Sequence, residues 1–128
     1  MDDISVEKIN LESQQQYKDN VFPLVYATSN VSDAAGVKDW LAEHKHRLEG
    51  ELTTHGAILF RGFNVVDDQD FDGFVRAFDW PSFTYEESLS NAVRHNRTEL
   101  VFTANEAPPS VSIFLHHEMA QTPIYPSK

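Results

Sequence analysis

The stretch SVSIFLHHEMAQ, residues 110–121, decides the interpretation of this chain, because it sets two histidines and a glutamate at the end of an apolar, β-rich run. Side chains two positions apart on a strand point to the same face. If residues 110–119 form a strand, His116 and Glu118 project together, whereas His117 faces the other side with Leu115. One imidazole nitrogen and one carboxylate oxygen then meet at a single ion. These are two members of the 2-His-1-carboxylate triad of non-haem Fe(II) oxygenases, and the third ligand, a second histidine, has to come from elsewhere.

The three residues HHE are not specific by themselves, because exposed polar residues at the end of a strand give the same pattern. The other histidines do not complete a site in any obvious way. His44 and His46 lie two positions apart on a predicted helix, where side chains do not face each other. A hydrolytic metal site that joins His116 and Glu118 to His55 or His95 is a further alternative, but no spacing argues for it.

The composition describes a folded, acidic protein. The chain has 128 residues, enough for one domain, and its 41% hydrophobic and 23% charged residues are close to globular averages. A formal net charge of −10 disfavours nucleic acid and membrane as partners. The absence of cysteine excludes disulfides, thiolate metal sites and a cysteine nucleophile. The acidic start MDDISVEKIN lacks the basic region of a signal peptide, so we expect a cytoplasmic protein.

The first half of the chain predicts an arm, a short strand and a helix. Residues 1–20 are polar and are expected to form an extended or frayed arm. The apolar run VFPLVYAT at 21–28 contains Pro23, which suits an edge strand or an extended segment better than a central strand. A helix is expected over 33–48, with Ser32 or Asp33 as its N-cap and an apolar stripe along one face.

The second half predicts a strand, a helix and then further strands, which gives an α+β fold class. GAILFRGF at 56–63 is expected to form a buried strand. A second helix starts with Asp67 or Asp68 as its cap and ends before the proline of DWPS. Two more strands are expected at 99–105 and 110–119.

Three segments together identify a family resemblance: HGAILFRGF at 55–63, FDGFVRAF at 71–78, and VFTANEAPPSVSIFLHHEMAQTPIYPSK at 101–128. They resemble the taurine catabolism dioxygenase (TauD/TfdA) superfamily, and within it the clavaminate synthase-like members. The resemblance covers about residues 33–128, and the order TANEAPP, LHHEMAQ, P-SK is its specific part. It implies that 33–128 is the N-terminal portion of a double-stranded β-helix (jelly roll) with two helices before the core strands. Residues 1–32 then form an N-terminal arm and the first short strand.

The resemblance also implies a chemistry. Members use Fe(II), with 2-oxoglutarate and O2 as co-substrates, to hydroxylate a small organic molecule. Their H-x-E/D motif matches His116 and Glu118, which are expected to be iron ligands, the glutamate as an anionic oxygen ligand and not a general base. The segment matching 103–106 lines the substrate pocket, so Asn105 is a candidate substrate contact. The competing interpretation of Asn105 is a turn residue before two prolines.

The chain also departs from the family pattern. The second iron histidine, a threonine after the first motif and the arginine that binds 2-oxoglutarate all lie beyond the position matching Lys128. Arg94 and Arg97 precede the motif and do not match that arginine. We therefore expect the N-terminal part of an oxygenase that is inactive by itself. The alternative is a non-catalytic truncated paralogue that acts as a binding protein, or a gene remnant.

Half of a jelly roll leaves strand edges and apolar faces without partners. We therefore expect the isolated 128-residue chain to be marginally stable, prone to aggregation or dependent on a partner. Thermal unfolding followed by circular dichroism tests this expectation. A sharp, cooperative transition in a monomeric sample would contradict it.

Overall fold

A computed structural model describes the following residues of the chain: 4–30, 34–83, 94–104, 106–120, 122–123 and 125. The chain divides into two compact units, Met1–Asp79 and Trp80–Lys128. The N-cap expected at Ser32 or Asp33 lies outside the described residues. The domain boundary expected after residue 32 stays a prediction.

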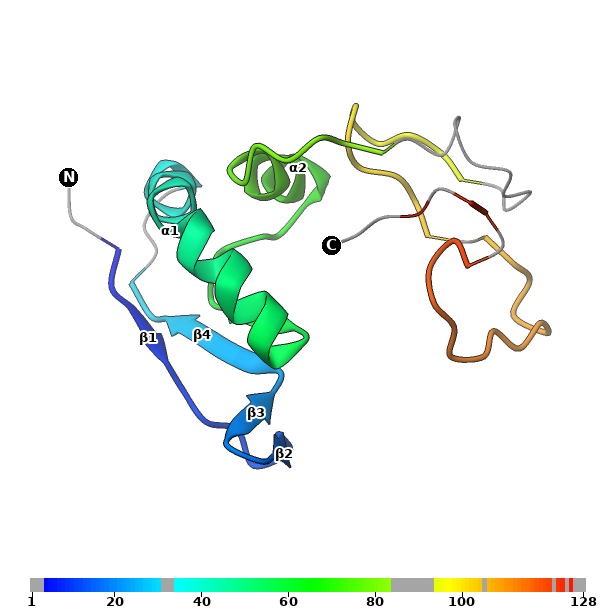
Figure 1. The fold of residues 1–128 in the computed structure, drawn as a ribbon. Coiled ribbons are helices and arrows are strands. Elements are labelled where there is room, and N and C mark those ends of the chain that lie inside the picture. Colours follow the sequence, from blue (N-terminus) through cyan, green and yellow to red (C-terminus); the bar gives the residue numbers. More distant parts are fainter. Residues whose placement is uncertain are drawn as a thin grey trace. The chain divides into compact units, whose positions relative to one another are not determined.

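The first unit is built on a three-stranded sheet in the order β1–β4–β5, of which Figure 1 shows β1 beside β4. The central strand β4 (Leu24–Thr28) pairs antiparallel with β1 (Val6–Lys8) and parallel with β5 (Ile58–Arg61). Parallel strands cannot be joined by a tight turn and need a long crossover. The helix α1 (Ala34–His55) provides that crossover.

The N-terminal region is more ordered than a frayed arm. Besides β1, it contains a hairpin of β2 (Gln15–Tyr17) and β3 (Asn20–Phe22). The expectation of an edge strand at 21–28 is wrong, because β4 is paired on both sides. Pro23, joined to Phe22 by a cis peptide bond, immediately precedes β4. Its missing N–H therefore lies outside the ladder and does not prevent pairing.

The helix α1 contributes one apolar stripe to the core. Val37, Leu41 and Leu48 of this helix are buried. They belong to the same core as Val25 of β4, which is fully buried. The helix predicted over 33–48 is confirmed but continues to residue 55. The next residue, Gly56, adopts a left-handed φ of 80° and donates its N–H to the carbonyl oxygen of Leu52 at 2.8 Å, which terminates the helix. Within the described part of the chain, no helix combines the length and the apolar character that crossing a membrane requires.

Aromatic rings fill the space on the helical side of β5. The ring of Phe60 lies 5.2 Å from those of Phe63 and Phe74 and 6.2 Å from that of Tyr26. Trp40 of α1 approaches Tyr26 to 5.6 Å, so the same cluster joins the helix to the sheet. Such offset and edge-to-face pairs add to the hydrophobic burial of each ring.

The second helix begins where the sequence places its cap. The side chain of Asp67 accepts a hydrogen bond from the N–H of Asp70 at 2.8 Å, and α2 (Asp68–Arg76) follows. The helix ends before Pro81, as expected. The strand predicted at 56–63 is present as β5, over fewer residues, but the prediction that it is buried is wrong, because Ile58, Leu59 and Phe60 are half-buried and Arg61 is exposed.

The second unit contains little regular structure in its described residues. Asn96 and Phe102 form an isolated antiparallel bridge, but no strand runs through 110–119 or through the described part of 99–105. These strand predictions are therefore wrong for this structure. A strand needs a neighbouring strand for its backbone groups, and the side chains of Phe114 and Leu115 are exposed. The described structure is a small α+β protein, and the jelly roll stays a prediction.

One alanine substitution is expected to have opposite effects at two glycines. Gly62 has a φ of 77°, and a Cβ there would collide with the backbone carbonyl oxygen of Thr28. Gly50 lies within α1 with nothing near its Cβ position. We expect Gly62→Ala to lower the free energy of unfolding by at least about 1–2 kcal/mol. Gly50→Ala should raise it by about 0.5–1 kcal/mol. Urea denaturation measures both values, and equal effects at the two sites would contradict the contact described at Gly62.

A polar cluster joins three elements of the first unit. The carboxylate of Glu51 accepts hydrogen bonds from Lys8 Nζ at 2.6 Å and from Tyr26 Oη at 2.7 Å. Burial alone would raise the pKa of Glu51, but these hydrogen bonds and the charges of Lys8 and Arg47 outweigh it, so the pKa lies below its ordinary 4.5. Burial and Glu51 raise the pKa of Tyr26, and the hydrogen bond to Glu51 raises the pKa of Lys8.

These shifts predict how stability depends on pH. The contribution of Glu51 is fully present above pH 4.5 and is lost as the pH falls through the lowered folded pKa. The contributions of Tyr26 and Lys8 are present below their ordinary values of 10.0 and 10.5 and are lost as the pH rises through the raised values. We expect Glu51→Gln to lose less stability than the unchanged protein on acidification. Unfolding midpoints measured across pH test this expectation, with Glu43→Gln, at an exposed position, as control. The same loss of stability at acid pH in Glu51→Gln and in the unchanged protein would contradict it.

Candidate metal centre

The structure brings His116 and Glu118 together in the second unit. The Nε2 atom of His116 lies 3.8 Å from Oε2 of Glu118. The two side chains are 57% and 46% exposed, so both donor groups can be reached from solvent. The predicted pairing of an imidazole nitrogen with a carboxylate oxygen is therefore present, although no strand produces it.

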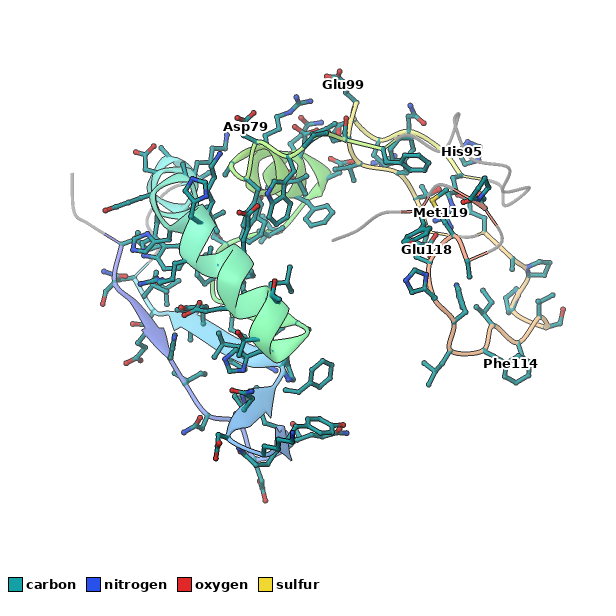
Figure 2. All side chains as sticks on the ribbon, in the orientation of Figure 1. Asp79, His95, Glu99, Phe114, Glu118 and Met119 are labelled. Atoms are coloured by element: carbon teal, nitrogen blue, oxygen red, sulfur yellow. The ribbon has the colours of Figure 1, made fainter. Side chains whose placement is uncertain are left out.

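A tight turn fixes the backbone at Glu118. The N–H of Ala120 donates to the carbonyl oxygen of His117 at 3.3 Å. The N–H and the hydroxyl of Thr122 both donate to the carbonyl oxygen of Met119 at 3.1 Å. Met119 adopts a φ of 58° and is only 3% exposed, so it anchors the turn beside Glu118, while Phe114 lies farther along the loop (Figure 2).

The position of the His116 ring suits metal ligation through Nε2. Its Nδ1 lies 2.7 Å from the carbonyl oxygen of Phe114. A proton on Nδ1 is donated to that oxygen, which leaves Nε2 with the lone pair that a metal requires. Because Nε2 is also the atom that faces Glu118, a metal bound between the two residues would meet this lone pair.

Glu118 has a second partner that the sequence does not reveal. Arg94 Nη2 donates to Glu118 Oε1 at 3.1 Å, and the Arg94 side chain is 16% exposed. The two carboxylate oxygens therefore differ, since Oε1 is held by Arg94 and Oε2 faces His116. The residues are 24 positions apart and follow no periodic pattern, so no sequence signal indicates the pair.

The donors fit part of a facial triad. Among the described residues, no group of three or more His, Cys, Asp or Glu side chains converges. His95 Nε2 pairs with Glu106 Oε2 at 3.3 Å, and His55 Nδ1, in the first unit, lies 2.8 Å from the carbonyl oxygen of Val21. The hydrolytic alternative therefore gains no support from the part of the chain that the structure describes. Asn105, the candidate substrate contact, lies outside the described residues.

A groove in the first unit does not carry comparable chemistry. Its volume is about 450 Å³, and its lining is mostly apolar, including Phe60, Phe63, Val66, Phe71 and Phe74. Its lining contains no acid, base or nucleophile. The candidate centre is therefore the pair in the second unit.

Comparison with known proteins identifies one family and two similar proteins. The family model described as taurine catabolism dioxygenase TauD, TfdA family matches residues 20–128. The chain is 36% identical over 124 residues to a clavaminate synthase-like protein of Arabidopsis thaliana. This alignment covers 92% of the present chain and 37% of the Arabidopsis protein. The chain is also 31% identical over 116 residues to the dapdiamide synthesis protein DdaC of Enterobacter agglomerans. That alignment covers 85% of the present chain and 34% of DdaC. The chain thus spans little more than a third of the length of these curated relatives.

Proposed function

The chain belongs to the taurine catabolism dioxygenase TauD, TfdA family, and from this membership we propose that it forms part of an Fe(II)- and 2-oxoglutarate-dependent dioxygenase. The proposed substrate is a small organic molecule that becomes hydroxylated while 2-oxoglutarate is oxidatively decarboxylated. The observation that carries the proposal is the 3.8 Å separation of His116 Nε2 and Glu118 Oε2. Both residues lie within the range that the family model matches.

The two side chains have distinct roles in this proposal. His116 supplies a nitrogen donor through Nε2, while its Nδ1, 2.7 Å from the carbonyl oxygen of Phe114, would hold the ring in position. Glu118 supplies an anionic oxygen through Oε2 and takes no part in proton transfer, since Arg94 occupies Oε1. The iron would supply the activation of O2 that neither side chain can provide.

The proposed activity belongs to a protein that includes this chain. The described residues contribute two protein donors, and two donors hold a divalent cation weakly. The chain alone is therefore proposed to turn over no 2-oxoglutarate. A third ligand and a seat for the 2-oxoglutarate carboxylate would come from residues that the described part does not supply.

A non-catalytic binding role is the second candidate, and one observation favours it. Val111, Ile113, Phe114 and Leu115 are 52% exposed or more, in one short segment. A contiguous exposed apolar patch is typical of a surface that contacts another protein. In that case, changes at His116 and Glu118 leave the function intact.

Adjacent histidines separate the two candidates. In the protein that contains this chain, we expect His116→Ala to lower Fe(II)-dependent turnover of 2-oxoglutarate by at least about 100-fold, because a direct ligand is lost. His117→Ala is the matched control. The His117 ring contacts the Tyr125 ring at 5.7 Å and is not paired with Glu118, so most of the turnover should remain. Succinate release measures both variants.

Equal losses in the two variants would contradict the assignment of the ligand. Full turnover in His116→Ala would remove His116 from the metal centre, and an absence of turnover in the unchanged protein would favour the binding role. Sequencing the gene beyond the codon for Lys128 defines the protein to be assayed.

A further inference from the structure

We propose that Arg94 is a positioning residue that holds Glu118 in place for metal binding. Its Nη2 donates to Oε1 at 3.1 Å, and the other carboxylate oxygen, Oε2, faces His116 Nε2 at 3.8 Å. The proposal rests on the proposed iron site and adds a residue to it. Arg94 would not touch the metal; it would act through Glu118.

The two carboxylate oxygens of Glu118 have different partners, and this difference affects how Glu118 can bind a metal. A glutamate can bind a metal through one oxygen or through both. A facial triad must leave three positions open for 2-oxoglutarate and O2, so a carboxylate that takes two positions would block one of them. With Arg94 hydrogen-bonded to Oε1, Oε2 is the oxygen that lies 3.8 Å from the His116 nitrogen, and Glu118 would bind the metal through this one oxygen.

The backbone next to Arg94 is held by a paired turn. The N–H of His95 donates to Thr103 Oγ1, and the N–H of Thr103 donates to the carbonyl oxygen of His95, both at 2.9 Å. The N–H of Arg97 donates to the carbonyl oxygen of Val101 at 2.8 Å, which closes the turn. Arg94 therefore extends from a fixed segment toward Glu118, which is itself fixed by the turn at Met119.

The burial of Arg94 distinguishes this pair from an ordinary surface ion pair. Exposed pairs contribute little because both side chains lose freedom and water screens the charges. The Arg94 side chain is only 16% exposed, whereas Glu118 is 46% exposed. The Arg94 guanidinium is thus restrained inside the unit, while the Glu118 carboxylate remains accessible. This arrangement is expected when an arginine orients a carboxylate for an incoming metal ion.

If Arg94 acts only through its charge, its loss should strengthen metal binding. If Arg94 positions Glu118, its loss should weaken metal binding. A positive charge near a divalent cation repels it, so removing the charge alone should strengthen metal binding. Losing a group that orients a ligand should weaken metal binding, typically by about 10–100-fold. The direction of the change therefore decides between a counter-charge and a positioning residue.

The test uses Mn(II), a hard divalent cation, and the iron-free form of the protein that contains this chain. Paramagnetic broadening of the His116 ring protons is followed by NMR, which reports binding at this site even when affinity is low. We expect Arg94→Gln to require about 10-fold or more Mn(II) for half-maximal broadening. Arg94→Lys should fall between it and the unchanged protein, because lysine keeps the charge but lacks the planar fork of donors.

Arg97→Gln is the matched control. Arg97 is exposed and lies three positions after Arg94, so this substitution removes the same charge nearby. It should leave the Mn(II) requirement unchanged or slightly lower it. Circular dichroism establishes that each variant folds like the unchanged protein, and Arg94→Lys keeps the test valid if Arg94→Gln does not fold.

Four results overturn the proposal. Binding to Arg94→Gln that equals or exceeds that of the unchanged protein makes Arg94 a counter-charge only. Equal weakening in the Arg94→Gln and Arg97→Gln variants removes the specific role. If Mn(II) leaves the His116 resonances of the unchanged protein sharp, or if Glu118→Gln has no effect, the iron site itself fails and the role of Arg94 with it.

Discussion

The parallel pairing of β4 with β5 determines how the first unit is arranged, because two parallel strands require a connection that returns over a face of the sheet. The helix α1 makes this return and buries Leu41 and Leu48. The close approach of Gly62 to the Thr28 carbonyl follows from the same pairing, since both lie at the ends of the paired strands. Glu51 then joins the helix to both β1 and β4 through Lys8 and Tyr26.

The candidate metal centre is held in a different way. Its residues lie outside regular strands, so their positions depend on the turn at Met119, the turn between His95 and Thr103, and the ion pair of Arg94 with Glu118. A ladder distributes its restraint over many equivalent hydrogen bonds, whereas these contacts are individual. Each of them therefore has a larger share in the geometry of the donors than a single ladder bond has in the sheet.

Features that depend on neighbouring residues could be predicted from the sequence. The start of α2 after its cap Asp67 follows from the capping residue, and the buried face of α1 follows from a periodic apolar stripe. The central place of β4 could not be predicted, because its partners are distant in sequence and the restriction imposed by Pro23 applies only to its own N–H. The length of α1 also depended on Gly56, which lies beyond the last clear member of the apolar stripe.

The candidate site was only partly predictable for the same reason. His116 and Glu118 lie two residues apart, so a local pattern and a family motif both indicate them. The strand that was expected to align them is absent, because strands depend on partners that no local pattern specifies. Arg94 approaches Glu118 through the fold of the second unit, and only the structure reveals that contact.

The central position of β4 also determines how the first unit opens. Its backbone is hydrogen-bonded on both sides, and Leu24, Val25 and Tyr26 are buried. The exchange of these amide protons with deuterated solvent requires the sheet to separate, so they report opening of the whole unit. The hairpin of β2 and β3, whose residues are largely exposed, can open without disturbing the sheet. Amide exchange should therefore be slowest in β4 and faster in the hairpin that precedes it.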